Sequence, residues 1–186
     1  ANEFAQMRRD LGFEFCRNES EKNPFVAGPL KRTDCSLVSD GAAAIVLTDV
    51  ETAMKLGRPA VAFRATAHVQ DFLPMSKRDA LLFEGCEAAW SRALKSAGLT
   101  IGDLSFVETH DCFTTTQYMA IDHFGLTPPG MSWQAIENGD LEIGGRCPMN
   151  PSGGLIGLGH PVGATGVSML ALGFRPNSGL AKDAGL

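Results

Sequence analysis

The sequence predicts an α/β domain in which a mixed β-sheet is flanked by helices, and three observations support this fold class. Short runs rich in β-branched and aromatic residues alternate with longer segments of helical periodicity. Clusters of glycine and proline separate these segments. The chain has 186 residues, of which 44% are hydrophobic and 20% charged, as expected of one globular domain.

The expected strands lie in the first two thirds of the chain. Residues 1–33 lack a sustained period and predict an irregular lead-in. Residues 39–49 predict a short helix or turn that leads into a buried strand at 45–47, and residues 59–69 predict a second β-rich stretch. Residues 103–111 predict a strand that ends in polar side chains.

Three helices are expected in the second half. Ser76 begins the clearest one, because Asp79 follows at the spacing of a capping box, and Gly98 ends it. Its apolar stripe consists of Phe83, Cys86, Trp90, Leu94 and Ala97. A second helix is predicted over 113–125, and residues 163–174 begin a third.

Charge and composition exclude several classes of partner. Sixteen basic and twenty-one acidic residues give a net charge of -5 without a basic cluster, which argues against nucleic acid. No apolar run approaches the roughly 20 residues of a membrane span, and the amino end lacks a signal-peptide core. We therefore expect no membrane partner and a cytoplasmic location, peroxisomal in a eukaryote. Five cysteines without a CxxC pair indicate reduced thiols and no metal.

The first segment that carries chemistry is VETHDCFTTTQ, residues 107–117. His110, Asp111 and Cys112 stand at the carboxyl end of a predicted strand and just before a helix, where ligands bind in open α/β sheets. A thiol there is a candidate for proton transfer or nucleophilic attack. The alternative is that Cys112 is a small buried hydrophobe and His110 a helix-capping residue. The spacing alone leaves both open.

The second segment is NPSGGLIGLGHPVGATG, residues 150–166. His160 stands between Gly159 and Pro161, so that its backbone is held by proline and can approach other groups closely at glycine. An immobilised imidazole suits a general base or an oxyanion donor, since its reference pKa lies near neutrality.

Other motifs do not fit these loops. A phosphate-binding P-loop needs lysine where Thr165 stands, and the dinucleotide fingerprint lacks its third glycine. Ser152 lacks the GxSxG spacing of a nucleophile elbow and is expected to be a loop residue. His68 and His123 are assigned to structure.

Four motifs together resemble the thiolases, specifically the sterol-carrier-protein-2 type and its bacterial and archaeal relatives. They are SDGAAA at 39–44, HDCF at 110–113, NPSGG at 150–154 and GHPVGATG at 159–166. The resemblance implies a thiolase-like layered half-domain over 34–174 that is incomplete at the carboxyl end. Residues 1–33 would then come from the preceding part of the family fold, and residues 175–186 would form an atypical tail.

The resemblance also implies an activity and site residues. Thiolases make or break a carbon–carbon bond between acyl groups on coenzyme A, through an acyl-enzyme on a cysteine. By this analogy His160 is the base that activates the nucleophile and a donor to an enolate-type oxyanion. His110 replaces the asparagine that holds an oxyanion-hole water in other thiolases, and Cys112 is the acid/base at the α-carbon. The substrate is an acyl-CoA thioester, and no cofactor is implied.

The sequence departs from the family pattern in two places. The family's nucleophilic cysteine belongs to an amino-terminal half to which nothing here corresponds, and Cys35 lacks its spacing. The final strands with their CxG motif are also missing. We therefore expect half of an active site that is inactive alone and a homo-oligomer in the full-length protein. Where the missing amino-terminal half would pack, we expect an apolar patch that is exposed or is buried by self-association.

Two other functions stay open. The chain could be a non-catalytic, thiolase-like assembly subunit, although such a subunit has no chemical need for His110, Cys112 and His160 together. It could also be an aldolase-like carbon–carbon lyase of the same superfamily. That enzyme is expected to place tyrosines near the site, and Tyr118 is the only tyrosine.

Overall fold

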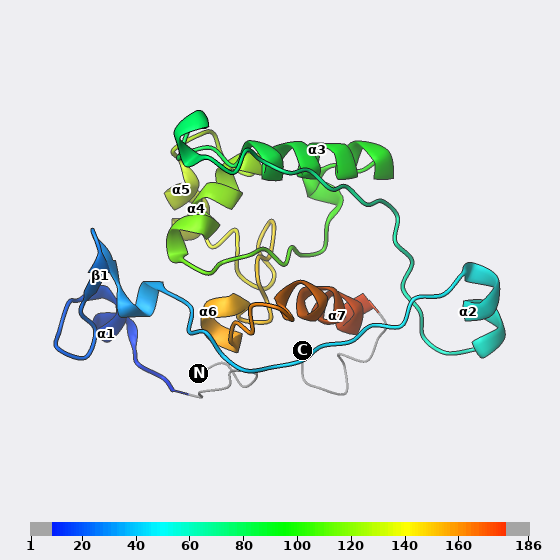
Figure 1. Cartoon of the computed structure of the whole chain (residues 1–186), viewed down its shortest axis with the longest axis horizontal. Helices are drawn as coiled ribbons and strands as arrows, with labels where there is room; N and C mark the ends of the chain where they lie inside the picture. Colours follow the sequence, from blue (N-terminus) through cyan, green and yellow to red (C-terminus); the bar gives the residue numbers. More distant parts are fainter. Residues whose placement is uncertain (1–8, 178–186) are drawn as a thin grey trace.

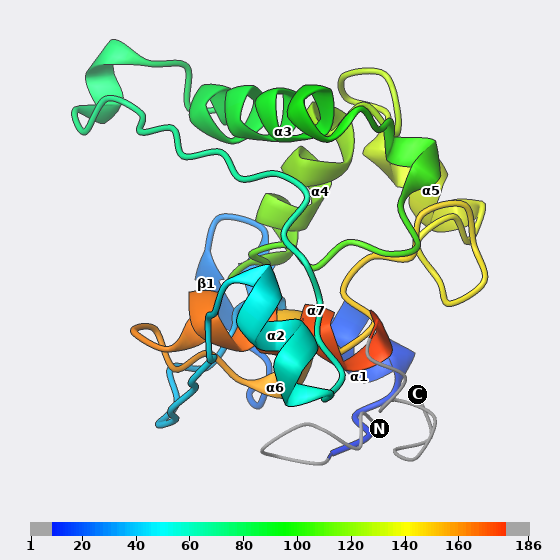
Figure 2. The ribbon, with the colours of Figure 1, turned by 90° about the vertical axis from the view of Figure 1, so that its right-hand side faces the viewer.

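The computed structural model describes residues 9–177 and contains two groups of helices (Figures 1 and 2). The first group is α3 (Glu84–Ala97), α4 (Thr114–His123) and α5 (Ser132–Glu137). The second group is α6 (Gly154–Leu158) and α7 (Thr165–Asn177). The tail expected at 175–186 begins inside α7, and its residues 178–186 lie outside the described residues.

The amino-terminal part forms short elements where an irregular lead-in was expected. It contains α1 (Phe13–Arg17), the antiparallel strands β1 (Phe25–Ala27) and β2 (Leu30–Lys31), and the 3-10 turn η1 (Arg32–Asp34).

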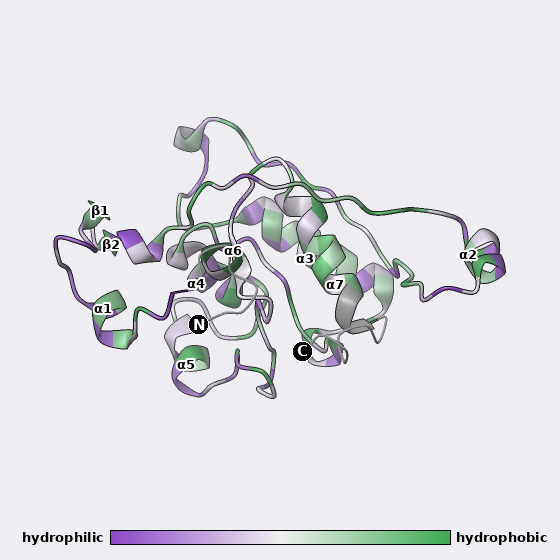
Figure 3. Ribbon diagram, turned by 90° about the horizontal axis from the view of Figure 1, so that it is seen from below, coloured by the Kyte–Doolittle hydropathy of each residue, from purple (hydrophilic) through white to green (hydrophobic). Residues whose placement is uncertain are grey.

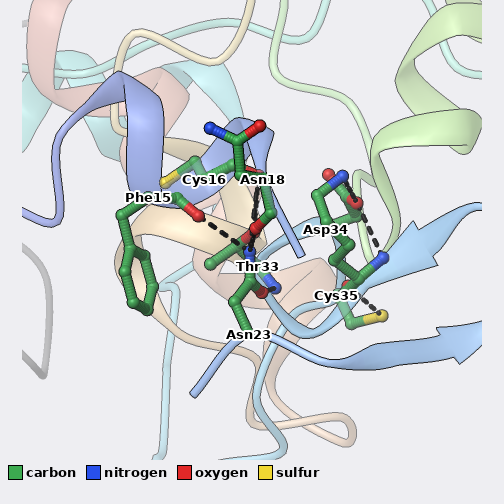
Figure 4. Close-up of polar contacts among 8 residues, drawn as sticks. Phe15, Cys16, Asn18, Asn23, Thr33, Asp34 and Cys35 are labelled. Atoms are coloured by element: carbon green, nitrogen blue, oxygen red, sulfur yellow. Dashed lines mark hydrogen bonds and ion pairs between the residues drawn. The ribbon is translucent and has the colours of Figure 1, made fainter. Parts of the chain in front are cut away.

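Asn23 holds this part together (Figure 4). Its side chain is fully buried, and its amide donates to the carbonyls of Phe15 at 3.0 Å and Asn18 at 3.2 Å. Its Oδ1 accepts from the Thr33 N–H at 3.0 Å. One buried amide therefore joins α1 to the end of the hairpin, because a buried polar group is costly unless its hydrogen bonds are made.

The hydrophobic core lies around α4. Its buried members are Val107, Ala120, Ile121, Phe124, Leu126, Ala135, Cys147 and Met149. Trp90 of α3 stacks on Phe124 with ring centroids 4.0 Å apart, so the predicted apolar stripe contacts this core through Trp90, whereas Cys86 of the same stripe is exposed.

The three predicted helices are present, and one start is wrong. Gly98 follows the end of α3, Phe124 caps α4, and α7 begins at Thr165 as expected. The helix predicted from Ser76 begins only at Glu84. Ser76 lies instead in the 3-10 turn η2 (Met75–Lys77), and Asp79 accepts from the nearby Leu81 N–H at 2.8 Å, so no capping box forms.

The strands predicted at 45–47 and 59–69 are wrong. Both lie in what we call the outer segment, residues 40–83, which runs along the outside and carries α2 (Val50–Leu56) away from the other helices (Figures 1 and 3). Val46 is 94% exposed and Phe63 is 58% exposed. Among residues 9–177 no neighbouring strand pairs with this segment, and a strand needs such a partner.

The sheet is therefore much smaller than predicted. Within the described chain it has two strands, β1 and β2. The strand predicted at 103–111 is an extended segment that forms one parallel bridge, Val107 to Met149, after the 3-10 turn η3 (Ile101–Asp103). The mixed α/β class is confirmed in a helix-rich form, and the extended segments carry the site.

Candidate active site

Three segments that lie far apart in the sequence meet at the site. Residues 35–41 run between the HDCF loop and the loop of His160. The Ser36 N–H donates to the Cys112 carbonyl at 2.8 Å, and the Ser39 N–H donates to the His160 carbonyl at 3.2 Å. The backbone of 35–41 thus joins both predicted site loops.

The position of His160 is fixed from both sides. Its backbone N–H donates to the Ser39 hydroxyl at 2.8 Å, and its ring Nδ1 lies 2.7 Å from the Thr165 hydroxyl. Gly41 packs so closely on Pro161 that an added Cβ would lie 2.8 Å from the proline Cγ. The SDGAAA motif therefore has a physical role here, because it supplies the serine and the glycine that hold the Gly-His-Pro turn.

His110 and His160 are in ring contact. Their centroids are 5.0 Å apart with an interplanar angle of 83°, an edge-to-face arrangement. Partial burial and the neighbouring His160 lower the pKa of His110, and Asp111 opposes this shift. Burial and His160 therefore favour the neutral form of the His110 imidazole.

Cys112 lies two residues after His110 and two residues before Thr114, the first residue of α4. Its side chain is half-buried, and the Cys112 carbonyl is held by Ser36. No side chain caps α4, so the alternative that His110 is a capping residue is wrong. The structure thus brings His110 and His160 together and places Cys112 two residues from one of them.

The site contains further polar groups whose contacts the sequence did not reveal. Asp111 and Glu108 bond to the loop of residues 152–155, and burial raises the pKa of both carboxyl groups. Asn150 accepts the Thr109 N–H on its Oδ1 at 2.7 Å and has a φ of 51°. The motifs contained all these residues, but a hydrogen bond to a distant loop leaves no trace in local spacing.

A cavity of about 240 Å³ is lined in part by Gly159 and Pro161, the chain neighbours of His160. Most of its lining is apolar, and Glu108 and Ser152 contribute polar atoms. Its lining includes Leu155, Leu158, Gly159, Thr165, Met169 and Leu172.

Cys35 belongs to the 35–41 segment of the site, and the other remaining cysteines and histidines lie outside this arrangement. His123 Nε2 accepts from the Phe83 N–H at 3.2 Å, which connects the start of α3 to α4, and its Nδ1 bonds within α4 to the Met119 carbonyl at 2.5 Å. His68 is exposed on the outer segment. All five cysteines are free, and burial raises the pKa of the Cys35 and Cys147 thiols.

Residues 9–177 contain neither a metal-binding cluster nor a helix that could span a membrane. No group of three or more histidine, cysteine and acidic side chains is arranged to hold a metal ion there. No helix in that range has the length and apolar character needed to cross a membrane.

Sequence comparisons give related proteins. A family model described as thiolase C-terminal domain-like matches residues 67–183. An acetyl-CoA acetyltransferase of Methanothermobacter thermautotrophicus is 39% identical over 147 residues, covering 78% of this chain and 38% of that protein. Sterol carrier protein 2 of Oryctolagus cuniculus is 36% identical over 143 residues, covering 74% of this chain and 26% of that protein. This chain thus spans well under half the length of these relatives.

A solved structure shares the fold. The Ltp2-ChsH2(DUF35) aldolase superposes with a TM-score of 0.71 over 87% of this chain and 42% of that chain. The sequence identity is 22%, so the likeness concerns the fold alone.

Proposed function

The chain belongs to the thiolase family, and from that membership we propose that it carries one half of an acyl-transfer site for coenzyme A thioesters. The observation that carries the proposal is the ring contact of His110 with His160, and Cys112 lies two residues from His110 in the chain. These are the residues that the motif resemblance assigned to the chemistry. The reaction is cleavage of a 3-ketoacyl-CoA by the coenzyme A thiol into two shorter acyl-CoA molecules, or the reverse condensation.

His160 acts as the base toward the nucleophilic cysteine. The Thr165 hydroxyl lies 2.7 Å from His160 Nδ1 and also donates to the Pro161 carbonyl at 3.1 Å. Because a hydroxyl has one proton, its lone pair faces the ring, and His160 donates from Nδ1. Nε2 then carries the lone pair that a base needs, and within residues 9–177 it has no hydrogen-bond partner.

His110 and Cys112 act on the substrate. The neutral imidazole of His110 orients a water toward the developing oxyanion without adding a second positive charge next to His160. When the bond between C2 and C3 of the ketoacyl group breaks, the departing enolate takes the Cys112 proton at its α-carbon. The Cys112 thiolate then takes the proton of the coenzyme A thiol that attacks the acyl-enzyme, which restores Cys112 and releases the nucleophile.

The nucleophilic cysteine comes from a complementary amino-terminal thiolase half. Burial keeps Cys35 and Cys147 protonated, which disfavours both as nucleophiles. The acetyl-CoA acetyltransferase that this chain resembles is considerably longer than the matched part, which supports a second contributing unit. We further propose that the complete protein is a homo-oligomer.

Acetoacetyl-CoA thiolysis tests the proposal. The purified chain is assayed alone, and again together with an amino-terminal thiolase half fused or added in trans. We expect activity only with the second half present. Activity of the chain alone that is abolished by His160→Ala would contradict the half-site, and inactivity in every combination would favour a non-catalytic assembly subunit.

A further inference from the structure

The segment that contains His110 carries two carboxylates, and both accept hydrogen bonds from the loop that precedes His160. Glu108 and Asp111 stand three residues apart, and each bonds to a residue 44 positions later in the chain. Glu108 accepts the Ser152 hydroxyl at 2.9 Å and the Ser152 N–H at 3.2 Å. Asp111 accepts the Leu155 N–H at 2.7 Å. We call Glu108 and Asp111 the carboxylate clamp.

Asp111 is seated directly against the backbone of that loop. It is only 4% exposed, and a carboxylate in such a place is costly unless backbone or side-chain donors satisfy it. Gly154 has a φ of 60°, and any Cβ at this position would overlap the Asp111 carboxyl group. The close approach therefore needs glycine at 154.

The loop transmits this constraint to His160. Leu155 lies in α6, and Gly159 ends that helix by donating its N–H to the Leu155 carbonyl at 3.1 Å. His160 is the next residue. At the other end of the clamp, Asp111 is the chain neighbour of His110. The clamp is thus connected to His160 through the short helix α6. It is connected to His110 through one peptide bond.

We infer that Glu108 and Asp111 are positioning residues that hold the His160 loop against the HDCF loop and so set the ring contact between His110 and His160. Neither carboxylate is given a role toward substrate. The consequence for turnover rests on the proposed function, whereas the geometric claim does not. A clamp with a purely structural role would change stability and leave the ring contact as it is.

The geometric claim is tested on the chain itself by nuclear magnetic resonance with isotope-labelled histidine. Ring protons of His110 and His160 are expected to give a nuclear Overhauser effect, given the 5.0 Å edge-to-face contact. In Asp111→Asn one amide group replaces a carboxylate that faces the N–H groups of both Leu155 and Ile156, so a donor opposes a donor. We expect this cross-peak to be lost, with the His123 signals unchanged.

Controls keep the test decisive. Asp49→Asn makes the same substitution at the exposed N-cap of α2, where asparagine can still accept the Thr52 N–H, and should leave the cross-peak intact. If Asp111→Asn does not fold, the same cross-peak is measured in Glu108→Gln, which alters only the contact of the clamp with Ser152. A full cross-peak in the folded clamp variants would overturn the inference.

The catalytic consequence is read separately. With the amino-terminal half present, Asp111→Asn should lower kcat about 10- to 100-fold with little change in KM, since a small misplacement of a catalytic group has effects of this size. If the wild-type combination shows no thiolysis, the proposed function fails, and the cross-peak still decides the positioning role.

Discussion

The imidazole rings of His110 and His160 meet edge to face, with centroids 5.0 Å apart, although fifty positions separate them in the chain. The contact is built by hydrogen bonds that run between segments. Residues 35–41 bond to both loops, and Glu108 and Asp111 bond across from one loop to the other. The candidate site therefore has a defined geometry in the part of the chain that the structure describes.

Replacing His160 should change the titration of His110. His160 contributes to lowering the pKa of His110, and Asp111 opposes that shift. We expect His160→Asn to raise the pKa of His110 and Asp111→Asn to lower it further. Titration of the ring signals by nuclear magnetic resonance measures both, and shifts of equal sign in the two variants would be inconsistent with the contact.

The pH dependence of stability should report on Glu108. Burial raises its pKa above that of the unfolded chain, so the folded state binds this proton more tightly. The stabilisation from the protonated Glu108 carboxyl group is fully present below the pKa that Glu108 has in the unfolded chain. It is lost as pH rises through the pKa that Glu108 has in the folded chain. Glu108→Gln removes this loss, so the stability of the variant relative to the wild type should increase from acidic to neutral pH in urea unfolding.

Asp103 provides a control of opposite sign for that measurement. Hydrogen bonds from Thr100 lower the pKa of Asp103, so its contribution is present above the unfolded pKa and is lost on acidification. Asp103→Asn should therefore lose stability relative to the wild type as pH rises. The same trend in both variants would contradict the assignment for Glu108.

Alanine at Gly154 should cost more than alanine at Gly125. Both glycines have positive φ, 60° and 78°, so both variants incur a left-handed backbone penalty of about 1–2 kcal/mol. Gly125 has open space for a Cβ, whereas Gly154 faces Asp111. We expect a further loss of about 1–3 kcal/mol at Gly154 from overpacking. Denaturant unfolding measures the difference, and equal losses would show that the Asp111 contact is unimportant.

The exposed outer segment should cause self-association of the isolated chain. Val46, Leu47, Met54 and Leu73 are all at least two-thirds exposed, and apolar surface of this extent promotes association. We expect particles larger than a monomer by light scattering and binding of a hydrophobic dye, both reduced when the amino-terminal half is present. A monodisperse monomer that binds no dye would count against a missing partner for this surface.

The helices could be predicted from the sequence because their signals are local. Gly98 ends α3 in a left-handed conformation, and Trp90 lies on the apolar stripe that faces Phe124. The start of α3 was missed because the N–H of Phe83 is bound by His123, 40 positions away, and the capping signal at Ser76 had no effect. The strands at 45–47 and 59–69 failed because β-propensity alone cannot supply a neighbouring strand.

The site was predicted in part. The motifs contained His110, Cys112 and His160, and the structure brings the two rings together. The support for those residues could not be predicted, because Asp111 bonds to Leu155 and Ser39 to His160 across long stretches of chain. Such bonds depend on how the loops pack, which periodicity and spacing do not encode.

The most direct test of the half-site is acetoacetyl-CoA thiolysis by the chain combined with an amino-terminal thiolase half, comparing wild type with His160→Ala and Asp49→Asn. Removing a general base and oxyanion donor should lower kcat by about 100-fold or more, because each role is worth roughly 100-fold or more in rate. Asp49→Asn, on α2, should retain full activity. Equal activity of wild type and His160→Ala would contradict the account.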